Sequence, residues 1–163
     1  MKNTMLEMSR YAALARQAVA EGVVLLKNEA VLPLAPGGRA ALFGYAQFHY
    51  YKSGTGSGGL VNVTHVPNLP EILGSDGGYR LDAEVQARYA AWLADHPYEM
   101  GTGWAQEPWF QPEMPLDEEF VRAAARRADT AFIVIGRTAG EDQDNTNTPG
   151  SFLLTEDEEN MLA

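Results

Sequence analysis

Residues 128–145 read ADTAFIVIGRTAGEDQDN, an apolar run followed by two glycines and a group of acids. Residues 130–135 carry no charge and are mostly β-branched or aromatic, which predicts a buried strand. Gly136 ends that run, and three carboxylates follow within residues 141–144. Two interpretations fit the pattern: a solvated surface loop, or a catalytic carboxylate at the mouth of a sheet.

The same order of elements occurs earlier, around residues 39–44, RAALFG, where a short apolar run again ends at a glycine. Each predicted strand follows a predicted helix. One helix begins with Ser9 as its N-cap and ends near Lys27 or Asn28, and the other is capped by Asp117. Helices that alternate with continuous apolar strands are typical of a mostly parallel sheet covered by helices on both faces, the α/β class.

The loops that follow the two strands are expected to lie close together. In parallel sheets, ligands gather outside the carboxyl ends of the strands. Residues 45–59, which are first aromatic and then glycine-rich, should therefore emerge at the same sheet edge as residues 136–145. The sequence predicts that a site forms where these two loops meet.

Two further helices complete the outline. Asp82 caps a helix that carries Val85, Tyr89, Trp92 and Leu93 on one face, and residues 155–158, TEDE, match a capping box. Because the chain ends at Ala163, barely two turns after that box, we expect a single α/β domain over residues 1–163 that is incomplete at its C-terminus.

The charge balance excludes several classes of partner. Twelve Lys and Arg face 22 Asp and Glu, a formal net charge of −10, so nucleic acid and anionic membrane would be repelled. No segment reaches the roughly 20 apolar residues of a membrane span, and the first residues do not resemble a signal peptide. The absence of cysteine fits a reducing cytoplasm or a cysteine-poor exported protein, and we expect a cytoplasmic location.

Cofactor and metal motifs are weak. Residues 54–59, GTGSGG, satisfy the dinucleotide-binding pattern, but no strand immediately precedes them and no helix immediately follows, so this context argues against a nucleotide site and a flexible linker explains the pattern better. His49, His65 and His96 never fall four residues apart on one helix, and the acids at 142 and 144 lack the rest of a calcium loop. We therefore expect no cofactor and no metal.

Aromatic residues are concentrated in two loops, residues 45–51 and 97–115. Flat aromatic faces stack on the C–H surfaces of sugars, and nearby carboxylate and amide oxygens accept hydroxyl protons. A carbohydrate pocket and an apolar patch that docks another domain explain this composition equally well.

Four segments together resemble the α/β-sandwich domain of glycoside hydrolase family 3, the β-glucosidase and β-xylosidase family. They are residues 20–34, AEGVVLLKNEAVLPL; residues 41–44, ALFG; residues 52–58, KSGTGSG; and residues 128–141, ADTAFIVIGRTAGE. The resemblance implies retaining hydrolysis of β-linked glucosides or xylosides. In that family an aspartate nucleophile lies on a separate (β/α)8 barrel, which this chain does not contain.

The resemblance also implies roles for single residues. Glu141 matches the general acid/base, and Lys52, Thr55, Ser57 and Asp144 match positions that line the sugar subsite. Many relatives have glycine after the catalytic glutamate and arginine after the later aspartate, where this chain has Asp142 and Asn145.

We expect this chain to be the N-terminal part of a family member with reversed domain order, inactive by itself and prone to associate with further copies. The alternative is a non-catalytic carbohydrate-binding or interaction module of the same fold.

Overall fold

The computed structural model describes residues 7–50, 56–75, 78–138, 141 and 144–163. The chain divides into two compact units, Met1–Leu34 and Ala35–Ala163, and each is described by itself. Among the site residues expected from sequence, Lys52, Thr55 and Asp142 lie outside the described residues.

The first unit contains one helix, α1 (Met8–Gly22), whose described residues are all exposed. The sequence prediction was wrong at both ends of this helix. Glu7 occupies the N-cap position without a side-chain hydrogen bond, so Ser9 is not the cap, and Val23 is already extended. The helix stops early because glycine and a β-branched pair, Val23 and Val24, are weak helix formers.

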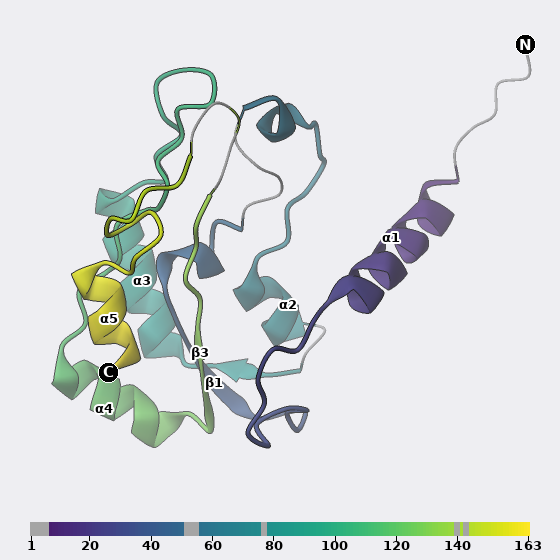
Figure 1. Ribbon diagram of the computed structural model, residues 1–163. Coiled ribbons are helices and arrows are strands. Elements are labelled where there is room, and N and C mark those ends of the chain that lie inside the picture. The colour runs from purple at the N-terminus through teal and green to yellow at the C-terminus, as the bar shows by residue number, and fades with distance from the viewer. Residues whose placement is uncertain (1–6, 51–55, 76–77, 139–140, 142–143) are drawn as a thin grey trace, which may run out of the picture. The chain divides into compact units, whose positions relative to one another are not determined.

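The second unit holds a three-stranded sheet in the order β2-β1-β3 (Figure 1). The strands β2 (Arg80–Leu81) and β3 (Thr130–Ile133) both pair in parallel with β1 (Arg39–Phe43). Helices accompany the sheet, so the predicted α/β class with a parallel sheet is confirmed.

Three helices share the core on one face of β1: α3 (Ala83–Asp95), α4 (Glu118–Arg127) and α5 (Glu156–Leu162). Their predicted caps are confirmed, since Asp82, Asp117 and Thr155 accept hydrogen bonds from the first turns. The buried core comprises Ala41, Phe43, Val85, Tyr89, Met114 and Ala124, with Met161 of α5 packed against it.

β3 is shorter than predicted and only half buried. It ends at Ile133, whose exposed fraction is 40%. The exposure arises because β3 is an edge strand that pairs with β1 alone, and every second side chain of β3 faces outward. The sequence analysis missed β2 and the helix α2 (Leu69–Ser75), both of which are too short to show a period.

Candidate active site

The site begins where β1 and β3 end. Gly44 follows β1 with a φ of +98°, and a Cβ there would lie 2.1 Å from the carbonyl oxygen of Val134. Only glycine therefore permits the two strands, β1 and β3, to lie this close at their carboxyl ends. The loops that follow the two strands leave the sheet at the same edge, as the sequence predicts.

Ser57 and Glu141 join the two loops. Ser57 donates its backbone N–H and its hydroxyl to the same carboxylate oxygen of Glu141, Oε2, over 2.9 and 2.6 Å. Ser57 lies in a short 3₁₀ turn, η2 (Gly56–Leu60), and Glu141 lies 84 residues further along the chain. The glycine-rich loop and the strand-end carboxylate thus form one site.

Gly56 makes that contact sterically possible. Its φ is +71°, and a Cβ at this position would lie 2.8 Å from both Cβ and Oε2 of Glu141. A larger residue would push Glu141 out of the reach of Ser57. The glycine therefore has a steric role beyond the flexibility of a linker.

The two hydrogen bonds from Ser57, first from its hydroxyl and then from its backbone N–H, lower the pKa of Glu141. Glu141 is exposed, so solvent also supports its ionised form. Such a carboxylate is predominantly ionised near neutral pH, which is the form that can act as a base. It can donate a proton only when a neighbouring negative charge raises its pKa.

Of the remaining expected site residues, Asp144 is described and exposed. It forms no hydrogen bond with Glu141 or Ser57 among the described residues, so the structure does not bring it into their contact. Thr55 directly precedes η2 in the sequence, and Lys52 lies three residues before Thr55.

A third loop contributes to the site, and the sequence analysis noted its aromatic residues without placing it beside Gly56. The side chain of Ala105, from the irregular residues 97–115, lies 3.5 Å from the point where a Cβ on Gly56 would sit. Ala105 is buried with a φ of +55°, while the neighbouring Trp104 has an exposed fraction of 52%. The cluster of aromatic residues in this loop was the available signal, but it gave no indication of which other loop it would touch.

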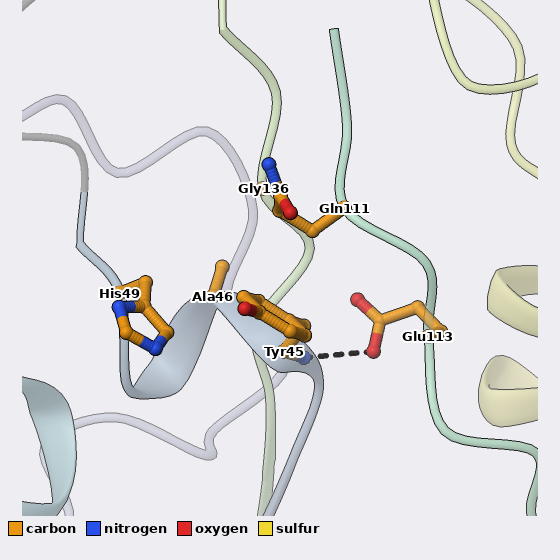
Figure 2. Close-up of a pocket in the computed structure, with 6 residues that line it drawn as sticks. All are labelled: Tyr45, Ala46, His49, Gln111, Glu113 and Gly136. Carbon is orange, nitrogen blue, oxygen red and sulfur yellow. Dashed lines mark hydrogen bonds between the residues drawn. The ribbon is translucent and has the colours of Figure 1, made fainter. Parts of the chain in front are cut away.

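A buried acid lies beside the strand ends as well. The Oε2 atom of Glu113 accepts a hydrogen bond of 2.7 Å from the backbone N–H of Tyr45, directly after Gly44 (Figure 2). Both residues, with Gln111 and Gly136, line a cavity that has room for one water molecule at most. Burial raises the pKa of Glu113 to about 7, against the lowering effect of the Tyr45 hydrogen bond. Sequence gave no sign of this residue.

The three histidines lie apart from one another in the described structure. His65 contacts the Glu71 carboxylate at 2.9 Å, His96 stacks on Trp92, and His49 stacks on Tyr45. Within the described ranges, no group of three or more metal-binding side chains has the geometry to hold an ion. No described helix is long and apolar enough to cross a membrane.

Comparison with known proteins adds family evidence to this geometry. Residues 23–162 match the model of the glycosyl hydrolase family 3 C-terminal domain. A β-glucosidase from Ruminococcus albus is 48% identical over 96% of this chain, and β-glucosidase A from Butyrivibrio fibrisolvens is 39% identical over 83%. The chain spans 16% of the length of each of these relatives.

Solved structures agree with the fold. A β-glucosidase from Paenibacillus barengoltzii aligns with a TM-score of 0.87 and 46% identity, over 93% of this chain and 17% of that one. β-Glucosidase 3B from Thermotoga neapolitana, solved in complex with glucose, aligns with a TM-score of 0.83 and 31% identity, over 96% of this chain and 22% of that one.

Proposed function

Because the chain belongs to glycoside hydrolase family 3, we propose that it supplies the general acid/base carboxylate, Glu141, of a retaining β-glycosidase. Its substrates are β-linked glucosides or xylosides, and its partner is a (β/α)8 barrel that carries an aspartate nucleophile. The chain alone is inactive, because one carboxylate cannot both form and break a glycosyl-enzyme intermediate. A cytoplasmic location stays a prediction.

The observation that carries this proposal is the contact between Ser57 and Glu141 at the carboxyl edge of the parallel strands. A carboxylate at this edge, on a loop rather than inside a strand, can reach the mouth of a facing domain. Ser57 fixes one oxygen, Oε2, and within the described part of the chain no hydrogen bond occupies Oε1, which we propose meets the leaving group or the attacking water.

The lowered pKa of Glu141 fits one half of the reaction cycle in particular. In the first step Glu141 must hold a proton, and the ionised nucleophile, roughly 5 to 5.5 Å away in retaining enzymes, raises its pKa. Once the nucleophile is glycosylated, its charge disappears. The pKa of Glu141 then falls toward the value that Ser57 sets, and Glu141 deprotonates the attacking water.

We assign the sugar subsite to the same loops. The Ser57 hydroxyl donates to Glu141, so its lone pairs remain for a sugar hydroxyl proton. Lys52, Thr55 and Asp144 are proposed as further contacts on the strength of the family resemblance. Trp104, which is half exposed and directly precedes Ala105 in the chain, is proposed as the aromatic residue on which a sugar ring stacks.

A second candidate function is a non-catalytic carbohydrate-binding or interaction module. The exposed rings of Trp104 and Tyr50, with exposed fractions of 52% and 62%, favour it, because stacking alone binds sugars. The two functions differ in Glu141, which a pure binding module does not need.

Kinetics with two leaving groups separate them. In the complete enzyme, Glu141→Gln should lower kcat/KM for alkyl β-glycosides by about 10² to 10⁴-fold but lower kcat/KM for dinitrophenyl β-glycosides far less, since that leaving group departs without a proton. Asp144→Asn is the matched control and should change KM without this dependence. Equal losses on both substrates in Glu141→Gln would contradict the assignment, and unchanged rates would favour the binding module.

A further inference from the structure

Arg137 lies at the start of the segment that carries Glu141, and its guanidinium binds both ends of that segment. Five N–H groups donate five hydrogen bonds. Nε donates to the Ser151 carbonyl at 3.0 Å, and Nη2 donates to the Leu153 carbonyl at 3.2 Å. Nη1 donates to the carbonyl of Gly136 at 2.9 Å, and both Nη atoms bind the Glu158 carboxylate. We call Arg137 with these partners the arginine clasp.

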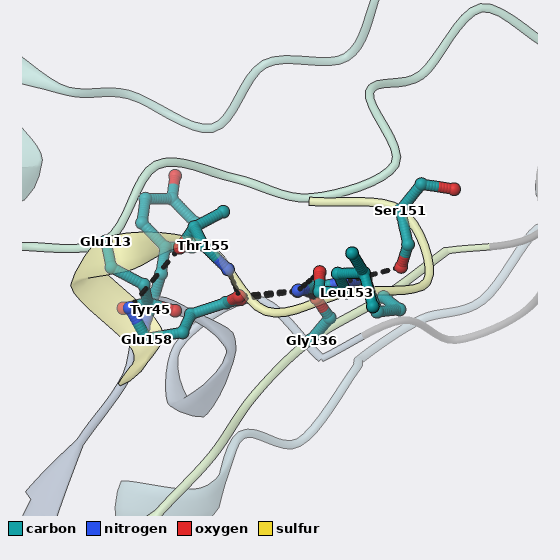
Figure 3. Close-up of polar contacts among 8 residues, drawn as sticks. Tyr45, Glu113, Gly136, Ser151, Leu153, Thr155 and Glu158 are labelled. Atoms are coloured by element: carbon teal, nitrogen blue, oxygen red, sulfur yellow. Dashed lines mark hydrogen bonds and ion pairs between the residues drawn. The ribbon is translucent and has the colours of Figure 1, made fainter. Parts of the chain in front are cut away.

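Glu158 anchors the clasp to α5 (Figure 3). Its Oε2 atom also accepts the backbone N–H of Thr155 at 2.7 Å, as the second half of the capping box that begins α5. The side chain of Glu158 is only 1% exposed. Burial acts to raise its pKa, but the hydrogen bonds from Arg137 and Thr155, with the charge of Arg137, outweigh burial and leave the pKa low. A buried negative charge of this kind requires the arginine beside it.

Neighbouring contacts hold the same two ends. Thr138, directly after Arg137, donates its N–H to the carbonyl of Trp109 at 2.9 Å. Gly150, just before Ser151, has a φ of +82° and lies so close to Phe110 that a Cβ would be 2.2 Å from the ring. Phe110 also faces Arg137, whose guanidinium carbon lies 5.7 Å from the ring centroid. The arginine clasp therefore holds the residues before Glu141, Gly136 and Arg137, against those after it, Ser151 and Leu153.

We propose that Arg137, anchored by Glu158, is a positioning residue that fixes the segment carrying Glu141 and so sets where that carboxylate stands for proton transfer. This inference rests on the function proposed for Glu141. Displacement of a catalytic group by about 1 Å can cost about 10²-fold in rate. A lysine would keep the charge but could not reach three carbonyls and a carboxylate at once, because it lacks the planar fork.

The test compares Arg137→Lys with a matched control in the complete enzyme. Arg127 is also partly buried, and it binds Asp82, the N-cap of α3, at 2.7 Å, but it lies before β3 rather than after it. We expect Arg137→Lys to lower kcat/KM about 10 to 100-fold for alkyl β-glycosides and far less for dinitrophenyl β-glycosides, because only the alkyl leaving group needs a proton from Glu141. Arg127→Lys should affect the melting temperature without any leaving-group dependence.

A second readout does not require activity. The backbone N–H of Ser57 donates to Glu141, so its hydrogen exchange reports whether Glu141 is in place. Hydrogen exchange in the peptide of residues 56–60 should accelerate in Arg137→Lys and in Glu158→Gln, and it should stay unchanged in Arg127→Lys. Glu158→Gln is chosen because glutamine can still complete the capping box of α5.

The outcomes separate this inference from the proposed function. If Glu141→Gln shows leaving-group dependence while Arg137→Lys slows both substrates equally and leaves exchange unchanged, the positioning role is refuted and the acid/base role stands. If exchange accelerates in Arg137→Lys but Glu141→Gln shows no leaving-group dependence, Arg137 positions Glu141 and the acid/base role is wrong.

Discussion

Glu113 and Glu141 are two carboxyl groups near the same sheet edge whose environments shift their pKa values in opposite directions. Ser57 stabilises the ionised form of Glu141, which is exposed. Burial instead raises the pKa of Glu113 to about 7, well above its usual 4.5. The charged groups that act on Glu113 are Glu158 and Asp157, which raise its pKa further, and Arg137, which lowers it.

The raised pKa of Glu113 predicts a pH-dependent stability. An acid whose pKa is higher in the folded state than in the unfolded state favours folding most at a pH below its unfolded pKa. This contribution to stability is lost as the pH rises through the folded pKa. Between about pH 4.5 and 7, the free energy of unfolding should therefore fall relative to Glu113→Gln by up to about 3 kcal/mol. Glutamine can still accept the Tyr45 N–H.

Thermal or urea unfolding of this chain and its Glu113→Gln variant across that pH range checks the prediction. The comparison cancels acids such as Asp129, whose lowered pKa changes stability equally in both proteins. A stability difference that stays flat from pH 4.5 to 7 would show that Glu113 ionises normally.

Sequence reasoning located the edge of the site but not all of its residues. Glu141 and Ser57 were both named from the family resemblance, and parallel strands that end at one edge explain why their two loops meet. Ala105, Glu113 and Arg137 were missed as parts of the site. Their roles depend on contacts between distant loops or on burial, neither of which leaves a local periodic pattern.

Among the elements, strong local signals gave correct predictions and weak ones did not. The capping residues of α3, α4 and α5 act within one helical turn, so sequence identifies them. The end of α1 was misjudged because the apolar stripe continues through residues 23–26, although Val23 is extended and the helix stops at Gly22. In β3, exposure of alternate residues depends on its edge position, which the apolar run of residues 130–135 does not reveal.

The first unit, Met1–Leu34, exposes several large apolar side chains. Val19, Val23, Val24 and Leu26 have exposed fractions of 68, 71, 75 and 91%. Contiguous exposed apolar side chains mark surfaces that associate. We therefore predict that the purified chain forms oligomers or aggregates with rising concentration, detectable by light scattering and by a dye that binds apolar surface. A monomer at high concentration that binds no dye would contradict this prediction.

The most direct measurement of the acid/base role of Glu141 is chemical rescue in the complete enzyme. Glu141→Ala should form a glycosyl-enzyme from a dinitrophenyl β-glucoside and then accumulate it, because no base activates water. Azide needs no deprotonation. It attacks the anomeric carbon, the ester bond to the aspartate breaks, and turnover resumes with a β-glycosyl azide as product. Asp142→Asn and Asp144→Asn should show no rescue.

Two results would contradict the assignment. The first is the absence of azide rescue in Glu141→Ala while Asp142→Asn or Asp144→Asn shows it, which would move the acid/base role to another carboxylate of the same loop. The second is an α-glycosyl azide from Glu141→Ala, which would mean that the substitution had removed the nucleophile. A β-glycosyl azide formed by Glu141→Ala alone is the result that the contact between Ser57 and Glu141 leads us to expect.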